Sequence, residues 1–138
     1  MAHLIAKRYS NIIVVDKHKA NLAILKKIHP EVIIEFADIS KPGSWQDHFI
    51  GADVVVMLQA QIGGLFYQEF VDNNVSSTSL ILDLVKSNSI PYLVHISSSV
   101  VESIADDFYT RSKIEQEKIV LESGIPCPIL RPTLMFGL

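Results

Sequence analysis

Short apolar runs alternate along the whole chain with longer segments whose apolar side chains recur at helical spacing. The helical segments lie at residues 2–9 (the end of a helix), Lys19–Ile28, 42–49, 66–88 and Phe108–Glu122. The apolar runs, rich in β-branched residues, predict strands at residues 12–15, 31–37, 53–58, Tyr92–Ile96 and 128–133. The order of elements is therefore strand, helix, strand, repeated to the end of the chain.

Each predicted strand is a continuous apolar run rather than an alternation of apolar and polar residues, which is typical of strands buried on both faces. Strands that alternate with helices form parallel sheets with helices on both faces. The sequence therefore predicts an α/β, Rossmann-like, three-layer fold. Its 138 residues fit one domain.

Polar residues follow four of the predicted strands. They are Asp16, Asp38, Gln59 and the triplet Ser97-Ser98-Ser99. A single polar residue at such a place is ordinary capping, but ligands of parallel sheets bind outside the carboxyl ends of the strands. Four polar strand ends in one sheet predict a binding crevice at that edge.

Tyr109 and Lys113 lie four positions apart at the start of a predicted helix, and so share one helix face. A tyrosine with a pKa of about 10 is a poor base near neutrality, but a neighbouring cation favours the phenolate and lowers that pKa. The pair is a candidate acid/base centre. The alternative is a solvated helix face with a half-buried aromatic ring.

Composition excludes several other classes of function. The net charge is −3 and the basic residues are scattered, so no nucleic-acid surface is expected. No apolar run approaches the roughly 20 residues that span a bilayer, and no signal peptide is visible, so we expect a soluble, cytoplasmic protein without a membrane anchor. The five histidines and the single cysteine, Cys127, are isolated from one another, and we expect no metal site.

Taken together, the serine triplet, Tyr109, Lys113 and the closing segment 130–137 (Leu-Arg-Pro-Thr-Leu-Met-Phe-Gly) resemble the short-chain dehydrogenase/reductase superfamily. The narrower resemblance is to its extended branch, the NAD-dependent epimerases and dehydratases that act on nucleotide sugars and related alcohols. It covers essentially the whole chain as part of an NAD(P)-binding Rossmann-type domain.

The resemblance implies how a cofactor would be held. Asp16 would accept hydrogen bonds from the adenosine ribose hydroxyls, which favours NAD over NADP because a carboxylate repels a 2′-phosphate. Asp38 and Ile39 match the pair that lies beside the adenine ring. Lys113 would hold the nicotinamide ribose.

The resemblance also implies hydride transfer at a carbinol carbon of a small-molecule substrate, possibly a nucleotide sugar. Tyr109 would exchange the hydroxyl proton, Lys113 would lower the pKa of Tyr109, and Ser98 would bind the developing carbonyl oxygen. Ser99 is a close competitor for the role of Ser98. Asn74 matches a helix asparagine of many members.

The sequence departs from the family pattern at both ends. The family's Gly-x-Gly-x-x-Gly turn lies about 20 residues ahead of the ribose acid, whereas 15 residues precede Asp16 and the first glycine is Gly43. We therefore expect a truncated domain that lacks its first strand, with two interior sheet edges left open. The alternatives are that the strands on either side close up on each other or that a partner fills the gap. At the other end, the chain stops at Leu138, before the family's substrate domain.

A shortened loop is the third departure, because Tyr109 follows Ser98 by only 11 positions. Because of these departures, we expect this chain to be inactive as an enzyme in isolation. The alternative is a non-catalytic module of the same superfamily that binds a dinucleotide or a partner. The family also suggests a homodimer formed through the helices at 66–88 and Phe108–Glu122.

Overall fold

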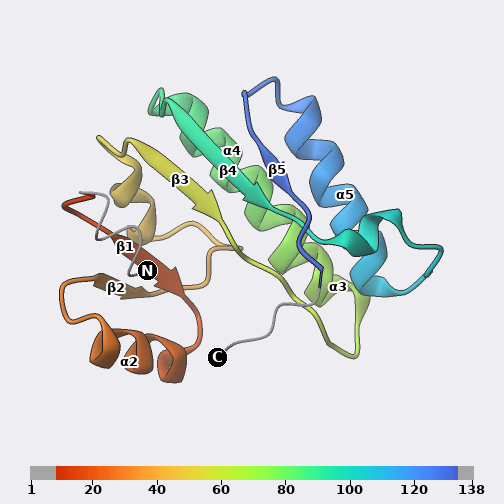
Figure 1. The fold of residues 1–138 in the computed structure, drawn as a ribbon, viewed down its shortest axis with the longest axis horizontal. Coiled ribbons are helices and arrows are strands. Elements are labelled where there is room, and N and C mark those ends of the chain that lie inside the picture. Colours follow the sequence, from red (N-terminus) through yellow and green to blue (C-terminus); the bar gives the residue numbers. More distant parts are fainter. Residues whose placement is uncertain (1–8, 134–138) are drawn as a thin grey trace. The chain divides into compact units, whose positions relative to one another are not determined.

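The structure is a computed structural model and describes residues 9–133. Its chain divides into two compact units, Met1–His48 and Phe49–Leu138, which are described separately (Figure 1). The helix end expected at residues 2–9 falls almost wholly outside the described residues.

The first unit is a β-α-β element. Strand β1 (Ile13–Asp16) and strand β2 (Ile33–Phe36) pair in parallel, with Ile13 opposite Ile33, and helix α2 (Lys19–Ile28) connects them. Lys26 Nζ closes the turn between helix and strand, donating to the carbonyl oxygens of Pro30 at 2.6 Å and Val32 at 2.8 Å. Both predicted strands and the predicted helix of this region are confirmed.

The predicted helix at 42–49 is a 3₁₀ helix, η1 (Ser44–Phe49), rather than an α-helix. Trp45 is buried in this segment, and its indole Nε1 donates to the carbonyl oxygen of Lys41 at 2.8 Å. Such a short segment between glycines, Gly43 and Gly51, has too few residues for regular α-helical turns.

The second unit contains a three-stranded parallel sheet. Strand β4 (Tyr92–Ile96) lies between β3 (Val54–Met57) and β5 (Ile129–Leu130). Among the described residues, β1 pairs only with β2 and β3 pairs only with β4. All five predicted strands are thus present and parallel, but they form two sheets rather than one.

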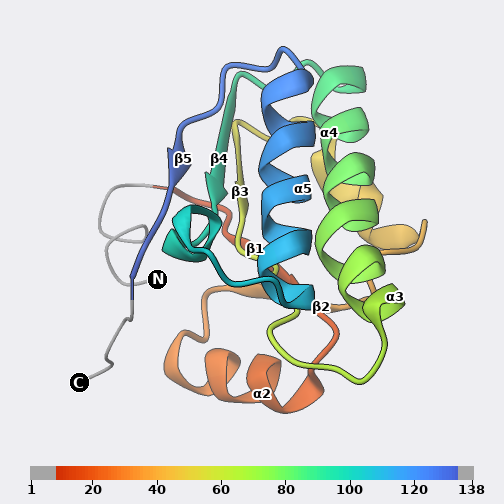
Figure 2. The ribbon, with the colours of Figure 1, turned by 90° about the vertical axis from the view of Figure 1, so that its right-hand side faces the viewer.

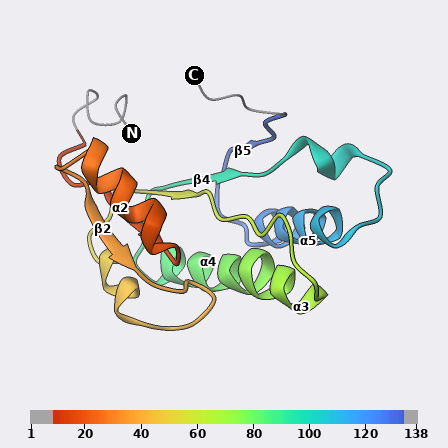
Figure 3. The ribbon, with the colours of Figure 1, turned by 90° about the horizontal axis from the view of Figure 1, so that it is seen from below.

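One face of this three-stranded sheet is covered by two neighbouring helical columns, as Figures 2 and 3 show. The first column runs without a break through α3 (Tyr67–Phe70), the π-helical turn η2 (Val71–Ser76) and α4 (Ser77–Ser87). The second is α5 (Phe108–Glu122). Between sheet and helices lies the core of this unit, which includes Met57, Leu93, Ile81, Val85 and Val120.

The predicted helix at 66–88 is therefore confirmed, with a π-helical turn that the sequence did not indicate. A short 3₁₀ helix, η3 (Ser99–Glu102), begins at the last residue of the serine triplet and was not predicted either. Gly124 ends α5 with a φ of 71°, a conformation that favours glycine. Within residues 9–133, no helix has the length and apolar character needed to cross a bilayer.

Candidate active site

The serine triplet continues strand β4 beyond its assigned end. The backbone N–H of Ser97 donates to the carbonyl oxygen of Leu130 at 2.7 Å, and that of Ser99 to Pro132 at 3.0 Å. Alternate residues of an extended strand point to the same face, so Ser97 and Ser99 share the face of His95. Ser98 lies on the opposite face, and its Oγ accepts from Val100 N at 3.3 Å as the N-cap of η3.

Helix α5 places Tyr109 and Lys113 one turn apart. Asp107 is its N-cap, and the carboxylate accepts from Thr110 N at 2.8 Å and from Thr110 Oγ1 at 3.2 Å. This cap fixes the helix start two residues ahead of Tyr109. The side chain of Tyr109 is half-buried, whereas Lys113 has an exposed fraction of 0%.

The Lys113 ammonium lies against the end of β4. Its Nζ donates to the carbonyl oxygen of Ile96 at 3.4 Å and to Gln116 Oε1 at 2.5 Å. Burial lowers the pKa of Lys113 to about 8, and the nearby Glu117 carboxylate partly opposes this change. The hydroxyl of Tyr109 makes no hydrogen bond to a described residue, so a direct effect of Lys113 on Tyr109 stays a prediction.

Asn74, in the π-helical turn, connects three elements. Its Oδ1 accepts from Gln61 N at 2.6 Å, and its Nδ2 donates to Gln61 O at 3.2 Å and to Ser112 Oγ at 2.9 Å. Asn74 therefore holds the backbone of the loop after β3 against α5. The sequence selected this asparagine only through the family resemblance.

Thr78 makes a second connection one helical turn further on. Its Oγ1 accepts from Gln59 Nε2 at 3.0 Å and from Gln116 Nε2 at 2.8 Å. Thr78 and Gln116 are completely buried. Neither was predicted as a site residue, although each lies four positions after another polar residue, Asn74 or Ser112, and so on the same helix face.

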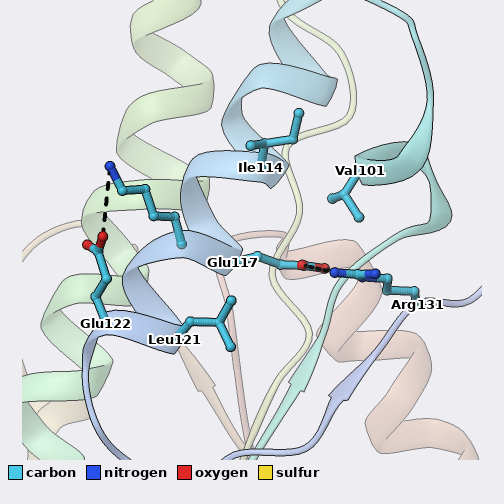
Figure 4. Close-up of a pocket in the computed structure, with 7 residues that line it drawn as sticks. Val101, Ile114, Glu117, Leu121, Glu122 and Arg131 are labelled. Atoms are coloured by element: carbon cyan, nitrogen blue, oxygen red, sulfur yellow. Dashed lines mark hydrogen bonds and ion pairs between the residues drawn. The ribbon is translucent and has the colours of Figure 1, made fainter.

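Glu117 and Arg131 join α5 to the end of β5, as Figure 4 shows. Arg131 Nε donates to Glu117 Oε1 at 2.9 Å and Nη2 to Oε2 at 2.7 Å, and Nη1 also pairs with Glu102. The Arg131 guanidinium holds the pKa of Glu117 below its ordinary value, although burial opposes it. Val101, Ile114 and Leu121 line an open depression beside this pair, which does not include Ser98, Tyr109 or Lys113.

His95 is buried in β4, and neither of its ring nitrogens has a hydrogen-bond partner within residues 9–133. Burial first, and then the positive charge of Lys113, lower the pKa of His95 to about 4, while Glu117 opposes the change. Ser97 Oγ also lacks a hydrogen-bond partner, although it lies near enough to Glu117 to help lower the pKa of that carboxyl. His95 is therefore neutral at physiological pH.

The predicted cofactor residues lie in the first unit, at the carboxyl ends of β1 and β2. Asp16 Oδ1 accepts from His18 N at 2.8 Å, and Asp38 Oδ1 accepts from Ser40 Oγ at 2.7 Å and Ser40 N at 3.1 Å. The Ser40 hydroxyl, with lesser help from Lys41 and Lys17, holds the pKa of Asp38 below its ordinary value against the effect of burial. Asp38 is followed directly by the half-buried Ile39.

Each unit thus gathers its own predicted residues at the carboxyl ends of its parallel strands. Among the described residues, no group of three or more His, Cys, Asp or Glu side chains could hold a metal ion.

This architecture is a Rossmann-like parallel α/β fold, and solved structures share it. The UDP-glucuronic acid 4-epimerase from Bacillus cereus, in complex with NAD, matches 99% of this chain with a TM-score of 0.84 and 21% identity, over 52% of its own chain. A UDP-galactose 4-epimerase matches 99% of this chain over 54% of its own, with a TM-score of 0.74 and 22% identity.

The dTDP-glucose 4,6-dehydratase DesIV from Streptomyces venezuelae, with NAD bound, matches 94% of this chain over 50% of its own, with a TM-score of 0.76 and 21% identity. This chain therefore has the fold of these epimerases and dehydratases, as the resemblance predicted, and spans about half their length. No protein-family model and no curated protein matches the sequence.

Proposed function

We propose that this chain is part of the NAD-binding domain of an epimerase or dehydratase that acts on a nucleotide sugar. One observation carries the proposal: in a fold shared with NAD-bound epimerases, the hydrogen bond from Lys113 Nζ to Ile96 O brings the Tyr109–Lys113 helix to the serine-bearing end of β4. The two units are in this view parts of one domain, and the activity belongs to the full-length protein.

The residues of the first unit suit the adenosine end of NAD. Asp16 uses Oδ1 for its own turn, which leaves Oδ2 for ribose hydroxyls. Asp38 is held ionised by Ser40 and can accept from an exocyclic amine, and Ile39 offers an apolar surface beside it. With Oδ2 open to the ribose, the Asp16 carboxylate favours NAD over NADP, because it repels a 2′-phosphate.

The residues of the second unit suit the reacting end. NAD, when bound, takes up or returns the hydride of a carbinol carbon. The hydroxyl of Tyr109 has no hydrogen-bond partner among the described residues, and it exchanges the substrate's hydroxyl proton. Lys113 has three N–H donors and two protein acceptors, so one donor is left for the cofactor ribose.

Ser98 and Ser99 remain two candidates for the hydroxyl that binds the developing carbonyl oxygen. Strand alternation favours Ser99, because it shares a face with His95 and Ser97, whose neighbours include Lys113 and Glu117 of α5. Ser98 already caps η3. We further propose a cytoplasmic location and a homodimer formed through α4 and α5.

A second candidate function is a dinucleotide- or partner-binding module without turnover. Complete burial of Lys113 favours it, since a buried ammonium held by Gln116 and Ile96 is not open to a substrate. The two candidates differ in chemistry rather than in cofactor binding.

Calorimetric titration with NAD tests the proposal. Wild-type protein should bind NAD in a saturable manner, and Asp16→Ala should weaken binding about 10-fold by removing a charge-assisted hydrogen bond. Asp47→Ala, which removes an exposed carboxylate from the same unit, and Tyr109→Phe should bind as the wild type does. If the wild type shows no saturable binding of NAD, or if Asp16→Ala binds it equally well, the proposal is wrong.

Turnover separates the two candidates. In the full-length protein, the reaction of NAD with UDP-galactose, UDP-glucuronic acid or dTDP-glucose, followed by the absorbance of NADH or by product analysis, should proceed only with Tyr109 intact. Tyr109→Phe should reduce the rate by at least about 100-fold. Binding of NAD without any turnover of these substrates would favour the non-catalytic module.

A further inference from the structure

Two hydrogen-bonded bridges join the π-helical turn and α4 to α5, which lie side by side (Figure 2). Asn74 donates to Ser112 Oγ at 2.9 Å, and Thr78 accepts from Gln116 Nε2 at 2.8 Å. Each bridge has a glutamine of the loop after β3 at one end, because Asn74 holds the Gln61 backbone and Thr78 holds the Gln59 side chain. Only the second bridge continues to Lys113.

The direction of every hydrogen bond in this second bridge is fixed by Thr78. A hydroxyl has one donor and two acceptor positions. Thr78 Oγ1 donates to the carbonyl oxygen of Asn74 at 2.7 Å, so both acceptor positions are left for the side-chain amides of Gln59 and Gln116. Gln116 must therefore turn its Nε2 towards Thr78 and its Oε1 towards Lys113.

We propose that Gln116 and Thr78 are positioning residues for the Lys113 ammonium. Gln116 contacts it directly, and Thr78 acts through Gln116 by keeping the amide oxygen rather than the amide nitrogen towards Nζ. Through its second acceptor position, Thr78 also couples Lys113 to the loop that begins at Gln59. The inference rests on the proposed function, in which Lys113 serves Tyr109 and the cofactor.

Few charged groups lie near the Lys113 ammonium, so its hydrogen bond to the Gln116 side chain is expected to influence its pKa. Glu117 of α5 is the carboxylate that acts on the ammonium, but Glu117 is already paired with Arg131. From β4 the neighbour is His95, which is neutral, and the side chains of η2 and α4 that bond the same stretch of α5 are the uncharged Asn74 and Thr78. Since burial disfavours the charged form, an amide oxygen turned towards Nζ at 2.5 Å should stabilise the ammonium, whereas an amide nitrogen in its place would not.

A pH titration of Lys113 by NMR tests this inference without any cofactor. The lysines are labelled with carbon-13 at the ε position, and Lys113→Arg identifies the Lys113 signal. In the wild type this signal should titrate near pH 8. Gln116→Leu should lower the midpoint by about 1 pH unit, the equivalent of one charge-assisted hydrogen bond. Gln116→Glu should raise it, because a carboxylate then faces the ammonium.

Thr78→Val should lower the midpoint in the same direction as Gln116→Leu, and Thr78→Ser should restore it. Ser77→Ala removes a buried hydroxyl that bonds only the helix backbone, and is the matched control that should leave the midpoint unchanged. If Thr78→Val does not fold, Thr78→Ala takes its place.

The inference is overturned if folded Thr78 variants titrate as the wild type does, or if Gln116→Glu fails to raise the midpoint. Neither result depends on NAD binding, so either can be told apart from a failure of the proposed function.

Discussion

His95 is the buried residue whose environment least suits its chemistry. Both ring nitrogens lack hydrogen-bond partners in the described part of the chain, and burial together with Lys113 lowers the pKa of His95 from 6.5 to about 4. The folded state therefore takes up the His95 proton at lower pH than the unfolded state does. The contribution of His95 to stability is complete above pH 6.5 and is lost as the pH falls towards 4.

His95→Leu should remove two buried, unsatisfied polar atoms and raise the free energy of unfolding at pH 7 by about 1 kcal/mol. It should also remove the loss of stability between pH 6.5 and 4. Urea unfolding across this range measures both effects, with His18→Ala as the control for an exposed histidine. A variant that is less stable, or that keeps the wild-type pH dependence, would contradict the assignment of His95 as a buried residue without a hydrogen-bond partner.

At the scale of single residues, a candidate site residue can be predicted from the sequence when its proposed role follows from its own chemistry. Tyr109 and Lys113 are found through their spacing, and Asp16 and Asp38 through their place after strands. Gln116 and Thr78 are not, because a neutral amide and a hydroxyl gain significance only when two helices pack side by side. The choice between Ser98 and Ser99 likewise needs the direction of the strand that precedes them.

At the scale of elements, α5 organises the second unit. Its cap at Asp107 sets the position of Tyr109, its buried face carries Lys113 and Gln116, and its Glu117 reaches Arg131 after β5. The pKa of Glu117 is lowered chiefly by Arg131. A carboxyl with a depressed folded-state pKa stabilises the protein above its ordinary pKa, and this stabilisation is lost as the pH falls through the folded value.

Glu117→Gln should therefore destabilise the protein at pH 7 by about 2 kcal/mol, through the loss of a charge-assisted pair. The difference from the wild type should shrink in acid, below about pH 4.5, because protonation of Glu117 removes the same charge in the wild type. Urea unfolding at pH 7 and below about pH 4.5 measures the difference in stability between Glu117→Gln and the wild type. Glu122→Gln, in an exposed pair with Lys118, is the control that should change little. A difference that is equal at both pH values contradicts the assignment.

Regular elements were predictable because their apolar periodicity is long and continuous, and the limits of α2, β4 and α5 agree with the sequence. The irregular helical segments were not predictable in this way. The π-helical turn η2 and the 3₁₀ helices η1 and η3 depend on local hydrogen bonds, such as Ser98 capping η3, that leave no periodic signal. One of these irregular segments, η2, carries Asn74.

At the scale of the molecule, the parallel strands fall into two sheets, β1-β2 and β3-β4-β5. The single sheet expected from the sequence is thus two sheets among the described residues. Similarity to solved structures extends over the whole chain but only half of theirs. This similarity supports the fold, and the activity on a nucleotide sugar stays a proposal.

The most direct test of the account is an NMR titration of nitrogen-15-labelled protein with NAD, with amide shifts mapped along the chain. Binding at the carboxyl ends of the strands should shift amides after β1 and β2, near Asp16 and Asp38, together with those of the serine triplet and of Tyr109 to Lys113. Amides that precede the strands, such as Ile12 and Ser89, should remain in place. An absence of shifts, or shifts confined to those amino-terminal strand ends, would contradict a dinucleotide site built around Tyr109 and Lys113.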